Sequence, residues 1–315
     1  MESPAVRRLD DLLAAARLGG PTPMAIAAAE DRSVLLAARS AAEAGIALPY
    51  LVGDSERITE IAAEEGIDLR SIGAEILDVP TAAGGPTVAA RRAVELVRSG
   101  QASLLMKGKL CTADMLRGVL DRENGLRNGR LLSHVAVTEV PGLDRLLYIT
   151  DAGVVLAPTL EQKLEIIRNG VAVARALGLA VPRVAILAAA ELVEAGNPTT
   201  IEAAALAKMS ERGQIAGAMV DGPFGLDNAI SMAAAEAKGI GGMVAGRADV
   251  LIVPGAEAGN LMSKVITFLA GGRMAGIVVG GRVPVVVTSR ADPPDGKLLS
   301  IALGAILARR VMSDE

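Results

Sequence analysis

Short runs of aliphatic residues alternate with longer amphipathic segments along most of the 315-residue chain. Met24–Ala29, Ser103–Met106 and Val250–Val253 are examples of the short runs. The segments between the runs carry apolar residues at the three- and four-residue spacing of amphipathic helices. Continuous apolar strands with helices between them are typical of parallel sheets that are covered on both faces. The sequence therefore predicts an α/β fold with mainly parallel sheets.

One segment breaks this alternation near the middle of the chain. Leu131–Val140 and Arg145–Thr150 are both strand-like and are joined by Pro141–Gly142, which predicts an antiparallel hairpin. The length of the chain allows two domains of ordinary size. We therefore expect a domain boundary near residue 140.

The composition excludes several classes of function. Aromatic residues make up only 1% of the chain, and it has a single histidine and a single cysteine. A zinc cluster or an internal disulfide cannot be built from these, and stacking platforms for nucleic acid bases have almost no material. The net charge of −4 offers no basic patch for a nucleic acid backbone.

Sequence features that mark membrane proteins and secreted proteins are missing as well. Charged residues interrupt the apolar stretches too often for a membrane span, and the first eighteen residues lack the pattern of a signal peptide. We expect a soluble, cytoplasmic protein without a bound metal ion. The chain also lacks the glycine patterns of dinucleotide-binding folds and P-loops and the nucleophile elbow of serine hydrolases.

Parallel sheets place ligands beyond the carboxyl ends of their strands, and the turn after Ser103–Met106 has suitable chemistry for an anion. Lys107 and Gly108 form the turn, and Thr112 opens the next predicted helix. A lysine, free main-chain N–H groups and a helix N-terminus together suit phosphate binding. The alternative interpretation is an ordinary turn with a solvated lysine.

Polar residues also mark the predicted hairpin. Ser133 and His134 lie inside an apolar run, so His134 either bonds main chain in the core or faces a cleft. Asp151 follows the second hairpin strand and can line a cleft or cap the next element.

Two later segments predict further cleft residues. Asp221 follows the predicted strand Ala216–Val220, where a carboxylate can cap a helix or face a ligand. Asn260 is expected to cap a helix over Asn260–Leu269, and Lys264 would lie one turn further on, near the positive end of that helix.

The densest cluster of polar residues follows the last predicted strand, Val285–Thr288. Ser289, Arg290, Asp292 and Asp295 lie within seven consecutive positions. Arginine binds phosphate through two parallel hydrogen bonds, and a nearby carboxylate can act as a general base. The alternative is a salt-bridged turn without a ligand.

Taken in order, these segments resemble the phosphate acetyl/butyryltransferase family, and the butyryltransferase branch in particular. The resemblance spans residues 24–307. It is carried by these stretches: Leu105–Thr112, Leu132–Val135, Ile149–Ala152, Gly213–Ile215, Asp221–Pro223, Ala258–Asn260 with Lys264, and Val287–Asp292.

The resemblance implies a fold, a reaction and a way of carrying it out. The fold would be two α/β domains of the isopropylmalate dehydrogenase type with the active site in the cleft between them. Residues 1–140 and 288–315 would form the first domain and 141–287 the second. The reaction would be acyl-CoA plus phosphate giving acyl phosphate plus CoA, by direct transfer in a ternary complex. CoA would be a substrate rather than a tightly bound cofactor, and a homo-oligomer is expected.

The resemblance also suggests roles for individual residues. Arg290 would bind phosphate and the developing oxyanion, with Ser289 and Ser133 as hydrogen-bond donors. Lys107, the Gly108 main chain and Thr112 would complete the phosphate pocket, with His134 beside it, and Asn260 and Lys264 would face the same cleft.

The general base for the thiol departs from the family pattern. Acetyltransferases of the family carry an aspartate seven residues after the serine, and that position is Gly296 here. The role therefore moves to Asp292 or, as the second choice, Asp295. A nucleophilic Cys111 is an alternative that direct transfer does not need.

Three alternative functions remain open at this point. The first is an acyltransferase that takes its acyl group from acyl carrier protein. The second is a decarboxylating dehydrogenase of the same fold that uses NAD and a metal ion. The third is a CoA-binding sensor without catalytic activity.

Overall fold

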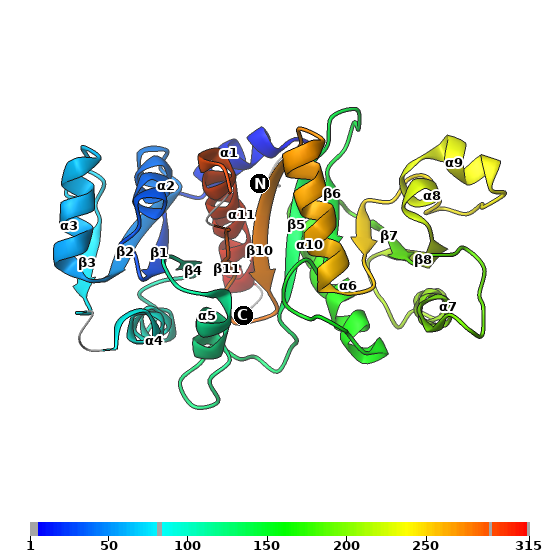
Figure 1. Cartoon of the computed structure of the whole chain (residues 1–315), viewed down its shortest axis with the longest axis horizontal. Coiled ribbons are helices and arrows are strands. Elements are labelled where there is room, and N and C mark those ends of the chain that lie inside the picture. The colour runs from blue at the N-terminus through cyan, green and yellow to red at the C-terminus, as the bar shows by residue number, and fades with distance from the viewer. Residues whose placement is uncertain (1–5, 81–83, 290–291, 314–315) are drawn as a thin grey trace. The chain divides into compact units, whose positions relative to one another are not determined.

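The computed structural model describes residues 6–80, 84–289 and 292–313 (Figure 1). The chain divides into two compact units, and each unit is built from two stretches of sequence. The first unit comprises Leu9–Arg130 and Ala275–Glu315, and the second comprises Met1–Arg8 and Leu131–Met274. The C-terminal stretch thus returns to the unit formed by the early part of the chain.

The first unit is a mainly parallel sheet with helices on both faces. Its strands lie in the order β3-β2-β1-β4-β11-β10, and β10 and β11 are antiparallel to each other. Helices α4 and α5 pack together on one face, and α1, α2, α3 and α11 pack in a row on the other (Figure 1). The elements are α1 (Leu9–Arg17), β1 (Thr22–Ala27), α2 (Arg32–Glu43), β2 (Ala47–Gly53), α3 (Ser55–Glu64), β3 (Glu75–Asp78), α4 (Gly85–Arg98), β4 (Leu104–Lys107), α5 (Thr112–Val119), β10 (Arg273–Val279), β11 (Val285–Val286) and α11 (Pro294–Ser313).

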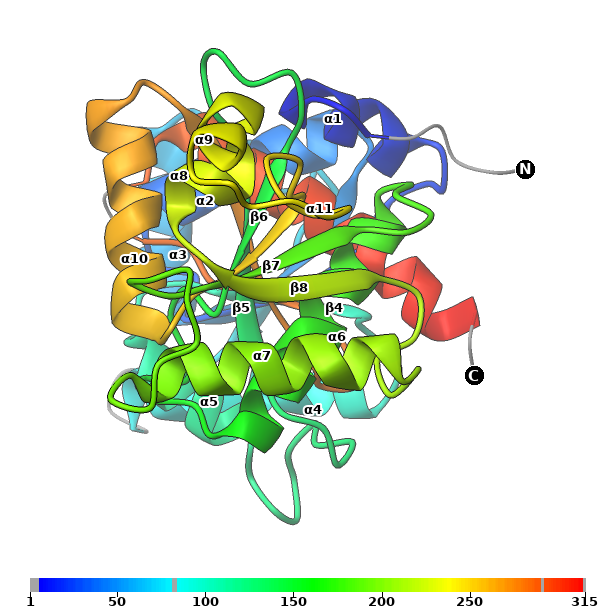
Figure 2. The same ribbon diagram turned by 90° about the vertical axis from the view of Figure 1, so that its right-hand side faces the viewer.

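The second unit has the strand order β5-β6-β9-β7-β8. Helices α6 and α7 lie on one side of these strands, and α8 and α9 lie on the other (Figure 2). Its core is aliphatic and contains one of the two phenylalanines, Phe224. The elements are β5 (Ser133–Glu139), β6 (Leu147–Thr150), α6 (Leu160–Ala176), β7 (Arg183–Leu187), α7 (Pro198–Glu211), β8 (Met219–Phe224), α8 (Leu226–Ile230), α9 (Met232–Ala237), β9 (Val250–Ile252), α10 (Ala256–Lys264) and the π-helix η2 (Val265–Leu269).

The hairpin predicted near residue 140 is present. Strands β5 and β6 pair antiparallel, with Ala136 opposite Ile149. The chain passes between the units after Arg8, after Arg130 and after Met274, whereas the sequence placed its two crossings at 140 and 287. The difference at 140 has a simple cause, because two strands that pair with each other stay in one unit.

The segment from Leu226 to Ala237 forms two short helices, α8 and α9, and the Ser231 side chain caps the second by accepting the Ala234 N–H. One strand of the second unit differs from the sequence prediction. The strand expected over Ala216–Val220 begins at Met219 and runs to Phe224. Asp221 therefore lies within β8 rather than after it.

Candidate active site

Three neighbouring parallel strands of the first unit end at one edge of its sheet. Strand β4 pairs with β1, with Lys107 opposite Ala27, and with β11, with Met106 opposite Val286. The carboxyl ends of parallel strands are where α/β sheets bind ligands. Three turns meet at this edge, and they follow β1, β4 and β11. The sequence had marked the last two of them.

The turn after β4 lies against the turn after β1 through main-chain contacts. The Gly108 N–H donates to the Ala27 carbonyl (2.8 Å), and the Lys109 N–H donates to the Ala28 carbonyl (2.7 Å). A Cβ atom at position 108 would lie 2.1 Å from the Ala28 oxygen, so only glycine fits there. Ala28 itself adopts a φ of 55°, which is uncommon outside glycine and holds its carbonyl in this position. These contacts hold the Lys107–Gly108 turn tightly against the turn after β1.

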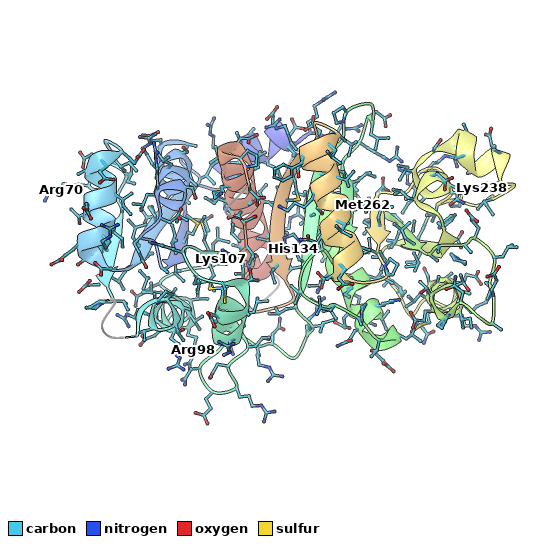
Figure 3. All side chains as sticks on the ribbon, in the orientation of Figure 1. Arg70, Arg98, Lys107, His134, Lys238 and Met262 are labelled. Atoms are coloured by element: carbon cyan, nitrogen blue, oxygen red, sulfur yellow. The ribbon has the colours of Figure 1, made fainter. Side chains whose placement is uncertain are left out.

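Lys107 is buried rather than solvated, so the alternative of a solvated lysine is wrong. Its side chain is only 7% exposed, and its Nζ donates to the Gly108 carbonyl (3.3 Å) and the Leu110 carbonyl (3.2 Å). Figure 3 labels Lys107 at the end of β4. The positive charge is therefore held over its own turn. Thr112 is half-buried and is the first residue of α5.

Cys111 precedes α5 and has a carboxylate as its partner. Its Sγ donates to Asp114 Oδ2 (2.8 Å), and this bond, together with Arg117, holds the pKa of Asp114 below its usual value. The hydrogen bond of the Cys111 thiol thus stays within the first turn of α5. The geometry gives no support to Cys111 as a nucleophile.

The turn after β11 is closed by hydrogen bonds between its ends. The Ser289 N–H donates to Asp292 Oδ2 (2.7 Å), and the Asp292 N–H donates to the Ser289 carbonyl (3.2 Å). Ser289 and Asp295 are exposed, and Asp292 is half-buried. Arg290, the predicted phosphate ligand, lies outside the described residues. Part of the Asp292 carboxylate is thus engaged in shaping the turn.

A second group of predicted residues meets in the second unit, where β5 begins beside the end of β6. Asp151 is 1% exposed, and its carboxylate accepts four main-chain N–H groups. Oδ1 accepts from His134 (3.1 Å), Gly153 (2.8 Å) and Val154 (3.0 Å), and Oδ2 accepts from Val155 (2.9 Å). Asp151 therefore ties the start of β5 to the loop after β6.

Ser133 and His134 both lie at this point of the second unit, but in different environments. Ser133 is fully buried and its Oγ accepts a hydrogen bond from Asn169 Nδ2 (2.8 Å), which also donates to the Leu131 carbonyl (2.9 Å). His134 is half-buried, and Gly153 lies directly beside it. Figure 3 labels His134 on β5. The structure thus joins Ser133, His134 and Asp151 in one group.

Asn260 and Lys264 do not have the helix positions that the sequence predicted. Helix α10 begins at Ala256, so Asn260 lies inside it, exposed, and does not cap it. Lys264 lies in the last turn of α10, with Nζ 5.5 Å from the centre of the Phe268 ring. Because η2 continues the helix over Val265–Leu269, Lys264 lies inside the helical segment rather than near its positive end.

Asp221 is not part of the group around Ser133. Strands β9 and β7 lie between β6 and β8, the strand that carries Asp221. Burial raises the pKa of Asp221, the Gly222 N–H that donates to Oδ1 (2.8 Å) opposes this, and Glu211 raises it further. The raised pKa has a structural origin at this edge of the sheet.

Sequence reasoning missed two buried polar residues that contact the predicted ones. Asn169 on α6 bonds Ser133, and Lys297 on α11 donates to the carbonyls of Ser289 and Asp292 (3.1 Å each). Both lie on the buried face of a helix, and a polar residue at such a position is the signal that could have found them.

Among the described residues, no helix is long and apolar enough to cross a membrane. Within the same residues, no three histidine, cysteine, aspartate or glutamate side chains are grouped as a metal ion would require.

Comparison with known proteins identifies relatives over nearly the whole chain. A family model described as phosphate acetyl/butaryl transferase matches residues 86–305. A phosphate butyryltransferase from Clostridium beijerinckii is 47% identical over 96% of this chain and 99% of its own. A phosphate acetyltransferase from Rhizobium meliloti is 46% identical over 96% of this chain and 94% of its own. Relatives with either acyl group in their names are thus almost equally similar.

Solved structures give the same result for the fold. A branched-chain phosphotransacylase from Enterococcus faecalis V583 has a TM-score of 0.77 and 29% identity, and the match covers 91% of this chain and 99% of that one. A 4-hydroxythreonine-4-phosphate dehydrogenase from Salmonella typhimurium has a TM-score of 0.59 at 13% identity, with 91% and 99% covered, and is similar in fold alone. The match of the family model and the close relatives over nearly the full length show that this chain belongs to the phosphate acetyl/butyryltransferase family.

Proposed function

We propose that this phosphate acyltransferase moves a short acyl group directly between the sulfur of CoA and an oxygen of phosphate, in a ternary complex. The overall reaction, acyl-CoA plus phosphate giving acyl phosphate plus CoA, is that of its family. The observation that supports the proposed site is the meeting of the Lys107–Gly108 turn and the Ser289–Asp292 turn at one sheet edge. These two turns bring a buried cation and a serine hydroxyl to the same edge of the sheet.

The chemistry can be balanced without a covalent enzyme intermediate. An oxygen of hydrogen phosphate attacks the thioester carbonyl, and a carbon–oxygen bond forms as the carbonyl oxygen takes on negative charge. The tetrahedral species then expels the sulfur as the carbon–sulfur bond breaks. The proton of hydrogen phosphate ends on the CoA thiol. The protein must therefore hold a dianion, stabilise an oxyanion and move one proton.

We assign the first two tasks to the turns of the first unit. The charge of Lys107 and the hydroxyl of Thr112 would hold phosphate beside Gly108, whose N–H is not free as the sequence suggested but donates to Ala27. Ser289 and Arg290 would be donors to phosphate and to the oxyanion. The burial of Lys107 supports this role, because a charge is stronger where water is excluded. Ser133 and His134 remain candidates for substrate contact from the second unit.

The proton carrier is assigned to a carboxylate of the Ser289 turn or of the helix after it. Asp292 Oδ2 already accepts the Ser289 N–H, which supports a role in holding the turn. Asp295 is exposed in the first turn of α11. We therefore favour Asp295 for proton transfer, ahead of the Asp292 that the sequence placed first.

A thiol-release assay tests the proposed function. The protein is incubated with acyl-CoA esters from acetyl to hexanoyl, with and without phosphate, and free thiol and acyl phosphate are measured together. We expect thiol release that depends on phosphate, with one acyl phosphate formed for each thiol. Absence of release with every ester would reject the function. Thiol release without acyl phosphate would indicate a hydrolase instead.

The same assay separates direct transfer from an acyl-enzyme route. Direct transfer predicts intersecting initial-rate patterns when both substrates are varied, and no exchange of labelled CoA into acyl-CoA while phosphate is absent. Exchange without phosphate would show a covalent intermediate. Acyl carrier protein thioesters, run in parallel, test the alternative donor, and binding of CoA without turnover would identify a sensor.

A further inference from the structure

Helix α11 carries a buried lysine close to the proposed phosphate site. Lys297 is only 2% exposed and lies in the first turns of a helix whose later residues Leu299, Ile301 and Leu303 are buried as well. Burying an ammonium group costs several kcal/mol unless hydrogen bonds and opposite charges compensate for it. The partners of Lys297 therefore show what its charge is used for.

Those partners are the two ends of one turn. Lys297 Nζ donates to the Ser289 carbonyl and to the Asp292 carbonyl, each at 3.1 Å. The two carbonyls belong to the same turn that the Ser289–Asp292 hydrogen bonds close. One ammonium group therefore bonds both ends of the turn. Its bonds are charge-assisted, and such bonds are about twice as strong as neutral ones.

An acidic residue at the start of another helix interacts electrostatically with the charge of Lys297. Asp31 caps α2, with Oδ1 accepting from the Ser33 N–H (2.9 Å) and the Val34 N–H (3.1 Å). Burial raises the pKa of Asp31, but the hydrogen bonds of Ser33 and Val34 and the charge of Lys297 outweigh it, so the pKa is lowered. The charges of Asp31 and Lys297 therefore attract each other.

We propose that Lys297 is a positioning residue, whose ammonium group sets the main-chain position of Ser289 and thereby the place at which the Ser289 hydroxyl meets phosphate. The proposal rests on the proposed function, because it takes the Ser289 turn as part of the phosphate site. It assigns Lys297 no contact with the substrate. Loss of the ammonium would release both carbonyls and weaken phosphate binding, while acyl-CoA binding would change little.

The test compares the full-length variants Lys297→Met and Lys297→Gln with the wild type. Lys297→Met keeps the length of the side chain and removes the donors, and Lys297→Gln restores an uncharged donor. We expect the KM for phosphate to rise about tenfold in Lys297→Met, with the KM for acyl-CoA within about twofold, and a partial return in Lys297→Gln. Urea unfolding of each variant shows whether the fold is retained.

A matched control lies one turn further along the same helix. Ser300 is also 2% exposed, and its Oγ accepts the Gly276 N–H (2.9 Å) and donates to the Gly296 carbonyl (2.7 Å). Ser300→Ala removes buried hydrogen bonds without touching the Ser289 turn. We expect it to lower stability while leaving both KM values unchanged.

A double-mutant cycle separates positioning from general structural support. If Lys297 acts through the turn, Lys297→Met adds little to the loss of kcat/KM already caused by Ser289→Ala. Fully additive losses, or equal rises in both KM values, would overturn the proposal. It would also be overturned if neither Lys297 variant folded, because the residue would then serve the fold. Wild-type kinetics in Ser289→Ala would instead reject the proposed function at this turn, which is a distinct result.

Discussion

At the scale of single residues, two aspartates that look alike in the sequence do different work in the structure. Both follow apolar runs and both were expected to line a cleft. Asp151 accepts four main-chain N–H groups, whereas Asp221 accepts a main-chain N–H from Gly222. Burial outweighs this bond at Asp221 and raises its pKa. Asp151 thus organises the main chain around it, whereas the charge of Asp221 is buried at a cost.

Replacing Asp151 tests the organising role. Asp151→Asn keeps one acceptor oxygen but turns a donor toward the bonded N–H groups, so we expect a loss of about 2 kcal/mol of unfolding free energy. Asp151→Ala leaves all four N–H groups without this partner and should cost more. The measurement is urea unfolding at neutral pH, with the exposed Asp78→Asn as a control that stays within about 0.5 kcal/mol. A neutral effect of both Asp151 variants would refute the role.

Replacing Asp221 should have the opposite effect on stability. Its pKa is raised in the folded state, chiefly by burial, so the folded protein holds the proton more tightly than the unfolded chain does. The resulting contribution to stability is full below the unfolded pKa and is lost as the pH rises through the folded pKa. Asp221→Asn retains an acceptor for the Gly222 N–H and should stabilise the protein at pH 7.

The pH dependence checks this sign. At about pH 3, where the wild-type carboxyl is largely protonated in both states, the two proteins should unfold at nearly the same urea concentration. The gain should then grow as the pH is raised toward neutrality. A variant that is less stable than the wild type at pH 7 would show that the charged form of Asp221 has a favourable partner.

At the scale of elements, some helix starts carry a local signal that can be read in a sequence. Asp31 caps α2, and Thr159 and Gln162 form the capping box of α6. Helix α10 differs, because contacts far from it in the sequence set its start. A Cβ at Gly255 would lie 2.2 Å from the Leu156 carbonyl oxygen, and one at Gly259 would lie 2.3 Å from the Asp151 oxygen. Asn260 resembled a cap only because these close approaches were not visible in the sequence.

The same distinction applies to the candidate site. The turns after β4 and β11 could be predicted, because polar residues directly after apolar strands are a local pattern. Their hydrogen-bond partners could not be predicted, because these residues meet the turns only in the folded chain. Lys297 bonds Ser289 across 8 positions of sequence, and Asn169 bonds Ser133 across 36 positions. Pattern alone shows that such residues are buried, without showing what they hold.

At the scale of the whole molecule, the first unit is completed by the last part of the chain. Strand β11 pairs with β4, and α11 packs on α1, α2 and β4. Gly304 of α11 lies so close to Leu104 that a Cβ there would be 2.7 Å from Leu104 Cδ1. The early strands therefore reach their final packing only when residues beyond 285 are in place, which makes this unit rich in contacts of long sequence separation.

A single substitution in α11 should therefore loosen strands at the other end of the sequence. Leu303 is fully buried, and Leu303→Ala is expected to cost about 2–5 kcal/mol through lost burial and the cavity that remains. Because α11 packs on α1, α2 and β4, we expect faster amide hydrogen exchange in those elements and in β1, beside β4, as well as in α11. Leu261→Ala on α10, where the side chain is 67% exposed, serves as the control with little effect. Faster exchange confined to α11 would show that the packing of this helix does not stabilise the early strands and helices of the unit.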